Sequence, residues 1–250
     1  MMPQDLKLEV PLGVQWRKQV HQSEATAMCF DRDGELIYTG GVDGVVKSWT
    51  AADGKEQDTM KGLTKNVTDV CASLEKDYVL ASSTDQNRMM LFRLQTKQRL
   101  VEYHGHTDVV NSCCFNFNHK RVVSCSQDRT VRFWDMLSTK NVHTTNCGTP
   151  VHNMDLSPNE EMLVTAHNRE IGVWDANHGK EIMAIPYDDA VTCAKFTPNE
   201  LYIVAAGRDN RVRLWDSHVE ADWQPLGRAR IPDIELWWFG LQERPLRLAE

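Results

Sequence analysis

The sequence has no long hydrophobic run and no excess of positive charge. No apolar stretch in its 250 residues approaches the roughly 18 needed to span a bilayer. Residues 1–20 contain no continuous apolar segment, so we expect no secretory signal. Lysine and arginine total 28 against 35 aspartates and glutamates, a formal net charge of −7. This balance argues against a broad nucleic-acid-binding face, and we expect no nucleic-acid partner.

The seven cysteines have no metal-binding pattern. No two of them are separated by two residues, as they are in many zinc sites. Cys29, Cys71, Cys114 and Cys193 lie in apolar, strand-like runs, so we interpret them as reduced core thiols of a cytoplasmic protein. No acid, base or metal-ligating cluster lies outside the repeats described below. We therefore predict a protein without enzymatic activity, metal or other cofactor.

Five segments recur at a period of about forty residues. Each ends on an aromatic residue, and successive aromatics are 43, 42, 40 and 41 residues apart: Trp49, Phe92, Trp134, Trp174 and Trp215. An aspartate follows the last three of these tryptophans directly. This period and the Trp-Asp ending are typical of WD repeats.

Each unit contains three alternating apolar runs separated by turn-forming residues. In the third unit the runs are VVNSCCF, RVVSCS and TVRFWD. Alternation at a period of two predicts strands, and a more polar fourth strand, such as KQRLVEYH, is expected after each unit. Four-stranded units repeated radially form a β-propeller. We therefore predict an all-β WD-repeat propeller with five recognisable blades.

The predicted blades cover residues 21–60, 61–104, 105–145, 146–186 and 187–218. In the N-terminal segment 1–20, the stretch GVQWRK is typical of an outer strand that closes a ring. For residues 219–250 we expect an irregular tail, whose first part can supply the fifth blade's outer strand. Because propellers have four to eight blades, we predict an incomplete six- or seven-bladed ring, with a closed five-bladed ring as the alternative.

The third unit holds the three side-chain types of an acyl-transfer triad. His106 lies 22 residues before Asp128, Ser124 lies four before Asp128, and Trp134 follows six after it. The first unit repeats these spacings with His21, Thr39, Asp43 and Trp49. A catalytic triad is needed once per site, so a set that recurs with the blades indicates a buried hydrogen-bond network rather than a catalytic site.

The other units lack parts of this network. The histidine position is occupied by Leu63 in the second unit, Cys147 in the fourth and Tyr187 in the fifth. The fifth unit keeps Asp209 and Trp215, and we include both in the predicted structural network. Because half-satisfied buried polar groups are unfavourable, we expect each network to be either whole or largely absent.

The loops that carry these histidines and aspartates form one face of a propeller, and we predict that this face binds other proteins. The residue before each turn aspartate, and the second residue after the histidine position, are expected to point there. These are Val42, Thr84, Asp108, Gln127, His167, Asp189 and Arg208. Several arginines near the turns are compatible with a patch for acidic peptides or phosphate, and also with an ordinary exposed strand face.

Across residues 10–218 the chain resembles WD-repeat proteins, and within them the C-terminal propeller of the autophagy-related sixteen-like proteins. The segments TGGVDGVVKSW and SCSQDRTVRFWD carry this resemblance, together with a fourth unit without Gly-His, TNCGTPVHNMDLS. The resemblance implies a non-catalytic scaffold that docks the lipid-conjugation machinery in autophagosome formation. Conjugation components would be partners, and the protein would be peripheral on autophagic membranes through indirect association. A generic adaptor in another complex, such as a ubiquitin-ligase substrate receptor, is the alternative.

The tail contains one short motif that fits this resemblance. In DIELWWFGL, Trp238 and Leu241 match the aromatic-x-x-aliphatic pattern by which autophagy adaptors add a strand to ubiquitin-like proteins. The alternative interpretation is an aromatic segment that covers an open propeller edge.

Overall fold

The computed structural model describes residues 16–73, 77–116, 120–217 and the backbone of 227–230. These residues form five four-stranded antiparallel sheets, the blades, each a meander in chain order. The first blade contains β1 (Ala25–Phe30), β2 (Leu36–Gly41), β3 (Val46–Thr50) and β4 (Glu56–Met60). The second contains β5 (Val67–Ala72), β6 (Tyr78–Ser83), β7 (Met89–Arg93) and β8 (Gln98–Tyr103). The third contains β9 (Val110–Asn116), β10 (Arg121–Ser126), β11 (Thr130–Asp135) and β12 (Asn141–Asn146).

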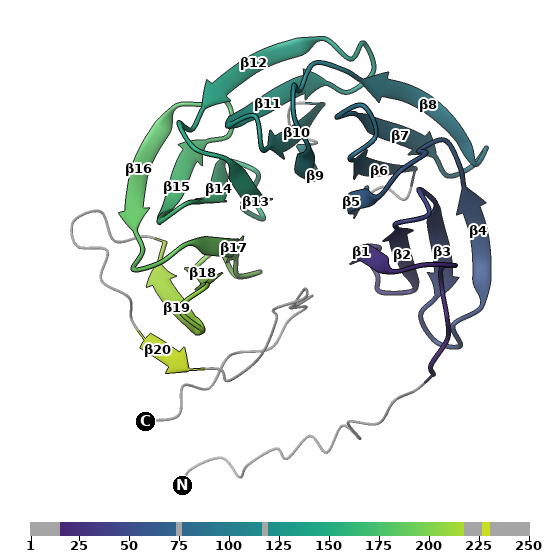
Figure 1. Ribbon diagram of the computed structural model, residues 1–250, viewed down its shortest axis with the longest axis horizontal. Helices are drawn as coiled ribbons and strands as arrows, with labels where there is room; N and C mark the ends of the chain where they lie inside the picture. The colour runs from purple at the N-terminus through teal and green to yellow at the C-terminus, as the bar shows by residue number, and fades with distance from the viewer. Residues whose placement is uncertain (1–15, 74–76, 117–119, 218–226, 231–250) are drawn as a thin grey trace, which may run out of the picture.

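The fourth blade contains β13 (Val151–Leu156), β14 (Met162–His167), β15 (Glu170–Asp175) and β16 (Glu181–Pro186). The fifth contains β17 (Val191–Phe196), β18 (Tyr202–Gly207), β19 (Arg211–Asp216) and β20 (Gly227–Arg230). Figure 1 shows the blades side by side along an arc, with the first strand of each blade next to a central space and the fourth at the periphery. The predicted all-β architecture of propeller blades is therefore confirmed. No helix of the described part of the chain is long and apolar enough to cross a membrane.

The hydrophobic core lies between neighbouring blades. Each of its four clusters draws its residues from two consecutive sheets, as where Tyr38 and Val46 pack in one cluster with Val70 and Phe92. In the second to fifth blades the aromatic residue of the third strand faces the preceding blade, so Trp134 lies in the cluster shared by the second and third blades. Because the middle strands are covered on both faces, they are buried along most of their length, as in β10.

The turn between the second and third strand of a blade is fixed by its aspartate. One carboxylate oxygen of Asp43 accepts the N–H of Val45 at 3.2 Å, and one oxygen of Asp128 accepts the N–H of Thr130 at 2.9 Å. This is an Asx-type turn, which the aspartate favours. In the first blade the next residue, Gly44, has φ of +72°, and a Cβ there would lie 2.7 Å from the Leu63 carbonyl oxygen. Glycine therefore suits this turn.

Polar side chains also join the inner strands of successive blades. The second residue of β1, β5 and β9 donates from its side chain to the backbone carbonyl of the first residue of the next inner strand. The three bonds are Thr26 to Val67 at 2.5 Å, Thr68 to Val110 at 2.5 Å and Asn111 to Val151 at 2.6 Å. These bonds fix the blades against each other around the central space.

The N-terminal segment differs from the expectation in its described part. Residues 16–20 are not in a strand. The Trp16 indole donates to the Ala51 carbonyl at 2.8 Å, and the Lys18 ammonium donates to the Gly54 carbonyl at 3.2 Å. Both carbonyls belong to the turn between β3 and β4, so the segment is held along the first blade by side chains instead of pairing as an outer strand.

The first part of the tail supplies the outer strand of the fifth blade, as the sequence analysis allowed. Strand β20 lies within 219–250 and pairs antiparallel with β19, from Arg211 opposite Arg230 to Leu214 opposite Gly227. The outer edge of β19 presents unpaired backbone groups, and β20 satisfies them, which completes the fifth blade. The motif residues Trp238 and Leu241 lie outside the described residues.

The two ends of the arc each expose an apolar sheet face. Figure 1 shows an open side between the fifth blade and the first, and no further sheet lies there in the described ranges. On the first blade, Met28 and Phe30 are 39% and 38% exposed. On the fifth blade, three side chains are only half-buried, although their fourth-blade equivalents are fully buried. They are Val204, Val212 and Leu214, equivalent to Val164, Ile171 and Val173.

Candidate functional site

The predicted polar residues of the third blade form a continuous chain of hydrogen bonds. The Trp134 indole donates to Ser124 Oγ at 2.8 Å, Ser124 Oγ lies 2.8 Å from His106 Nε2, and His106 Nδ1 lies 2.7 Å from the Asp128 carboxylate. One arrangement of protons satisfies every member. The indole N–H donates to the serine, the serine O–H donates to Nε2 of a neutral imidazole, and its Nδ1–H donates to the carboxylate.

The first blade repeats this chain. The Trp49 indole donates to Thr39 Oγ1 at 2.9 Å, Thr39 lies 2.9 Å from His21 Nε2, and His21 Nδ1 lies 3.1 Å from the Asp43 carboxylate. Both chains run from a buried tryptophan to the turn of the loop face, and they tie the loop before β1 or β9 to that turn. They therefore hold the loop face in place.

The electrostatics of the third-blade chain favour a charged aspartate beside a neutral histidine. Burial would raise the pKa of Asp128, but hydrogen bonds from His106, Thr130 and the Thr107 backbone N–H hold it well below its usual range. Burial lowers the pKa of His106, which favours its neutral form. Charge and tautomer therefore agree with the hydrogen-bond directions.

We expect no ester, peptide or phosphate hydrolysis that depends on this chain. Ser124 is 0% exposed, and its hydroxyl is already engaged by His106 and Trp134, so no substrate can reach it. Purified wild-type protein and Ser124→Ala would be compared on chromogenic substrates of each class, with folding checked by circular dichroism. Turnover that disappears in a folded Ser124→Ala variant would contradict the structural interpretation.

The second blade contains a replacement network that the sequence did not predict. Thr64, one residue after Leu63, donates its hydroxyl to the Asp85 carboxylate at 2.6 Å. Arg88 lies 2.7 Å from Asp85 and 2.9 Å from Glu102. Asp85 is therefore fully paired without a histidine, although we expected the network to be largely absent from this blade. The signal in the sequence was an arginine three residues after the turn aspartate.

The fifth blade uses an arginine and a tyrosine. The Arg213 guanidinium stacks 4.1 Å above the Tyr187 ring and pairs with Asp209 at 2.6 Å and Asp188 at 2.5 Å. The Tyr187 hydroxyl donates to the Arg211 carbonyl at 3.1 Å. The structure therefore brings the predicted Asp209 into an ion-paired cluster. Trp215, also predicted, is 2% exposed and packs in the core between the fourth and fifth blades.

The residues predicted to contact partners differ in exposure. Asp108, Asp189 and Arg208 are exposed, and Val42 is 40% exposed. Thr84 and Gln127 are half-buried. The backbone N–H groups of Val42, Thr84, Gln127 and Arg208 all donate to the loop before their blade's inner strand, at 2.8–3.0 Å. These four positions are therefore equivalent, and the repeats fix their backbone in the same way.

His167 occupies the same position in the fourth blade but does not face solvent. Its ring is buried, with 3% of the residue exposed, and Nδ1 lies 3.2 Å from the Thr149 hydroxyl. The fourth blade keeps the inner end of the network, since the Trp174 indole donates to Thr165 Oγ1 at 2.8 Å. Cys147 and Asn168 replace the histidine and aspartate, and His167 packs inward to the Thr149 loop instead.

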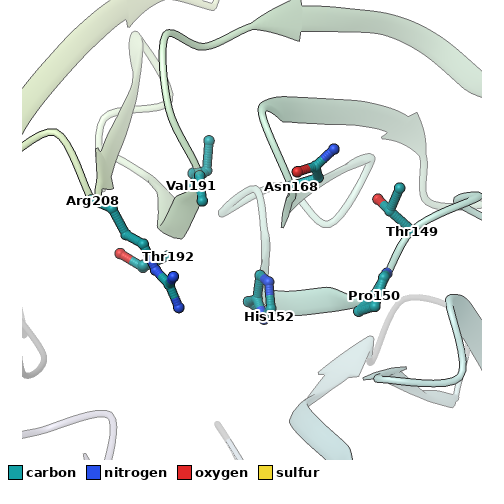
Figure 2. A pocket seen from close by; sticks show the side chains of 8 residues that line it. Thr149, Pro150, His152, Asn168, Val191, Thr192 and Arg208 are labelled. Carbon is teal, nitrogen blue, oxygen red and sulfur yellow. The ribbon is translucent and has the colours of Figure 1, made fainter.

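A pocket of about 430 Å³ lies between the fourth and fifth blades on the loop face. Figure 2 shows His152 and Arg208 reaching into it from the two blades. Its lining comprises Thr149, Pro150, His152, Asn168, Ala190, Val191, Thr192 and Arg208. Arg208 was predicted as a partner residue, and the other lining residues were not.

Comparison with known families agrees with this architecture. The model of the WD domain, G-beta repeat, matches residues 15–50, 97–135 and 179–216. The chain contains WD repeats. The matched segments contain Trp49, Trp134 and Trp215, the aromatic residues that end the first, third and fifth repeats.

Several known proteins are similar to this chain at low identity. It is 27% identical over 201 residues to Protein tipD of Dictyostelium discoideum, covering 78% of this chain and 32% of that protein. It is 25% identical over 208 residues to Autophagy-related protein 16 of Arabidopsis thaliana, covering 80% and 40%. It is 24% identical over 238 residues to the Serine-threonine kinase receptor-associated protein of Mus musculus, covering 91% and 67%. The matches to the first two thus span 32% and 40% of their length.

Proposed function

We propose that this chain is a scaffold whose loop face docks components of the autophagy lipid-conjugation machinery. One observation carries the proposal. Two exposed side chains at equivalent positions, Val42 and Arg208, are presented on one face by backbone bonds that recur from blade to blade. Rigid loops lose little conformational entropy on binding, which suits a docking surface. The similarity to Autophagy-related protein 16 supports the choice of partner.

The proposed location follows from the proposed partners. The protein would act in the cytoplasm and at the periphery of autophagic membranes, and it would reach those membranes through bound proteins. The described residues hold no helix that could cross a bilayer, which is compatible with such indirect association.

A generic adaptor in another complex is the second candidate. It is favoured by the similarity to the Serine-threonine kinase receptor-associated protein, which extends over 91% of this chain and 67% of that protein. Such an adaptor would use the same loop face for a different partner, so the two candidates differ in what binds and not in where it binds.

Recovery of the conjugation enzymes with the tagged chain tests the proposal. We expect the double variant Val42→Asp, Asp108→Lys to lower their recovery by about tenfold. It adds a negative charge at position 42 of the loop face and reverses the charge at position 108. Leu137→Asp is the matched control, since Leu137 is 58% exposed in the β11–β12 turn at the opposite end of the blade. Wild-type protein that recovers none of these enzymes, or a double variant that recovers as much as wild type, would contradict the proposal.

A further inference from the structure

The row of bonds between inner strands is interrupted at one place. Thr26, Thr68 and Asn111 each donate to the next blade, and the equivalent residue of the fourth blade is His152. His152 makes no such bond to Val191, the first residue of β17. The pocket described above opens at this junction, and both His152 and Val191 line it. The seam between the fourth and fifth blades therefore lacks this side-chain bond, and it is joined on the loop face by the Val191 N–H, which donates to the Asn168 carbonyl at 2.6 Å.

The Arg208 guanidinium is the permanent positive charge of the pocket. Arg208 is exposed, and no carboxylate of the described residues pairs with it. Two other arginines of the blades are occupied: Arg88 pairs with Asp85, and Arg213 pairs with Asp188 and Asp209. An unpaired guanidinium in a concave site presents a planar fork of donors to an anionic ligand.

The remaining lining suits a small anionic side chain. Thr149, Thr192 and Asn168 supply hydroxyl and amide groups, and Pro150 and Ala190 supply apolar surface for an aliphatic stem. Burial, and then the positive charge of Arg208, lower the pKa of His152, so the imidazole tends to be neutral and adds little charge. Asp189 flanks the rim, where its carboxylate accepts the Ala190 N–H at 2.7 Å. A single cation beside this acidic rim fits one carboxylate better than a phosphoryl group, which carries nearly two charges.

We propose that this pocket binds one aspartate or glutamate side chain from an exposed segment of a partner protein, with Arg208 as the group that pairs with the carboxylate. This inference rests on the proposed docking role of the loop face, and it adds the chemistry that one part of that face recognises. In Figure 2 the His152 and Arg208 side chains extend toward the central space, from which an extended segment can approach.

Oriented peptide pools test the inference. Capped nonapeptides with degenerate flanks and a fixed central glutamate, glutamine or phosphoserine are immobilised, and retention of the purified chain is measured. We expect the glutamate pool to retain the wild type about tenfold better than the glutamine pool, and Arg208→Gln to abolish this difference. Arg211→Gln is the matched control, because it removes the same charge from the same blade outside the pocket.

Three outcomes would overturn the inference. They are equal retention by the glutamate and glutamine pools, unchanged retention of Arg208→Gln, and stronger retention by the phosphoserine pool, which would assign the pocket to a phosphoryl group. The proposed function has its own readout in the recovery of the conjugation enzymes. Wild-type chain that recovers no conjugation enzymes but keeps the peptide preference would contradict the proposed function alone. Wild-type chain that recovers the enzymes but has no peptide preference would contradict this inference alone.

His152→Thr provides a second variant that does not depend on loss of charge. A threonine at this position can donate to the Val191 carbonyl, as Thr26 and Thr68 do for their neighbours. We expect it to narrow the pocket and lower retention by the glutamate pool several-fold, while the melting temperature stays the same or rises. Retained stability would exclude misfolding as the cause. Unchanged retention would show that this seam does not form the site.

Discussion

Trp134→Ala is expected to lower the free energy of unfolding by about 3–5 kcal/mol, the usual cost of removing a buried aromatic side chain. Trp134 is 1% exposed and packs between the second and third blades, with its ring 5.9 Å from that of Tyr103. The substitution opens a cavity at this junction and removes the indole donor to Ser124. Denaturant unfolding followed by circular dichroism measures the loss.

Trp134→Phe separates the contribution of ring packing from that of the indole hydrogen bond to Ser124. The second blade has Phe92 at the equivalent position, 1% exposed, so a phenyl ring fits this kind of site. Trp134→Phe keeps most of the buried ring and loses only the hydrogen bond to Ser124, so we expect a smaller loss of about 1–2 kcal/mol. Equal losses for the two variants would mean that packing between the blades contributes little.

Asp128→Ala is expected to cost roughly 1–3 kcal/mol, because it leaves the buried His106 and neighbouring donors without their acceptor. The carboxylate accepts hydrogen bonds from His106, from the Thr107 N–H, and from both the N–H and the hydroxyl of Thr130. Glu24→Ala also removes a carboxylate, but from an exposed position with no side-chain hydrogen bond in the structure. Its effect should stay within about 0.5 kcal/mol. Similar melting temperatures for the two variants would contradict the role of the network.

The cost of Asp128→Ala should depend on pH in a defined direction. The pKa of Asp128 is held below its usual range in the folded chain, so its contribution is fully present above the ordinary aspartate pKa of about 4. The contribution is lost as pH falls further, because the unfolded chain then binds the proton first. The difference in stability between wild type and Asp128→Ala should therefore narrow below about pH 4. A difference that stays constant from pH 7 to pH 3 would contradict this assignment.

The repeats and their complete networks were predictable because they obey fixed spacings. The spacing of 22 residues from His106 to Asp128 recurs from His21 to Asp43, and the structure joins both pairs. A periodic pattern of this kind fixes strand order and blade number without knowledge of long-range contacts. The blade architecture could therefore be derived from the sequence.

The replacement networks could not be derived in the same way. In the second blade the hydroxyl that reaches Asp85 comes from Thr64, one residue beyond the position where a histidine was sought. In the fifth blade Arg213 reaches Asp209 from the middle of a strand. A buried carboxylate requires donors but does not specify which residue supplies them, so spacing alone does not identify the donor.

The pocket was missed for a related reason. It lies where His152 does not make the side-chain bond that its equivalents make to the next blade. The local sequence pattern around His152 does not show that this bond is absent. Only comparison of equivalent positions, Thr26, Thr68 and Asn111 against His152, shows the difference. The buried orientation of His167 was also not predictable, since it depends on the Thr149 hydroxyl of a preceding loop.

The placement of the core between blades has a consequence for local unfolding. The second, third and fourth blades each share clusters with two neighbours, whereas within the described residues the first and fifth share only one. Stability in such an array is close to a sum over neighbouring pairs. Opening should therefore begin at the two ends of the arc, where Met28 and Val204 lack full cover, and proceed inward. Backbone amides of the third blade would exchange with solvent last, and the loop face would keep its folded structure longest around Gln127.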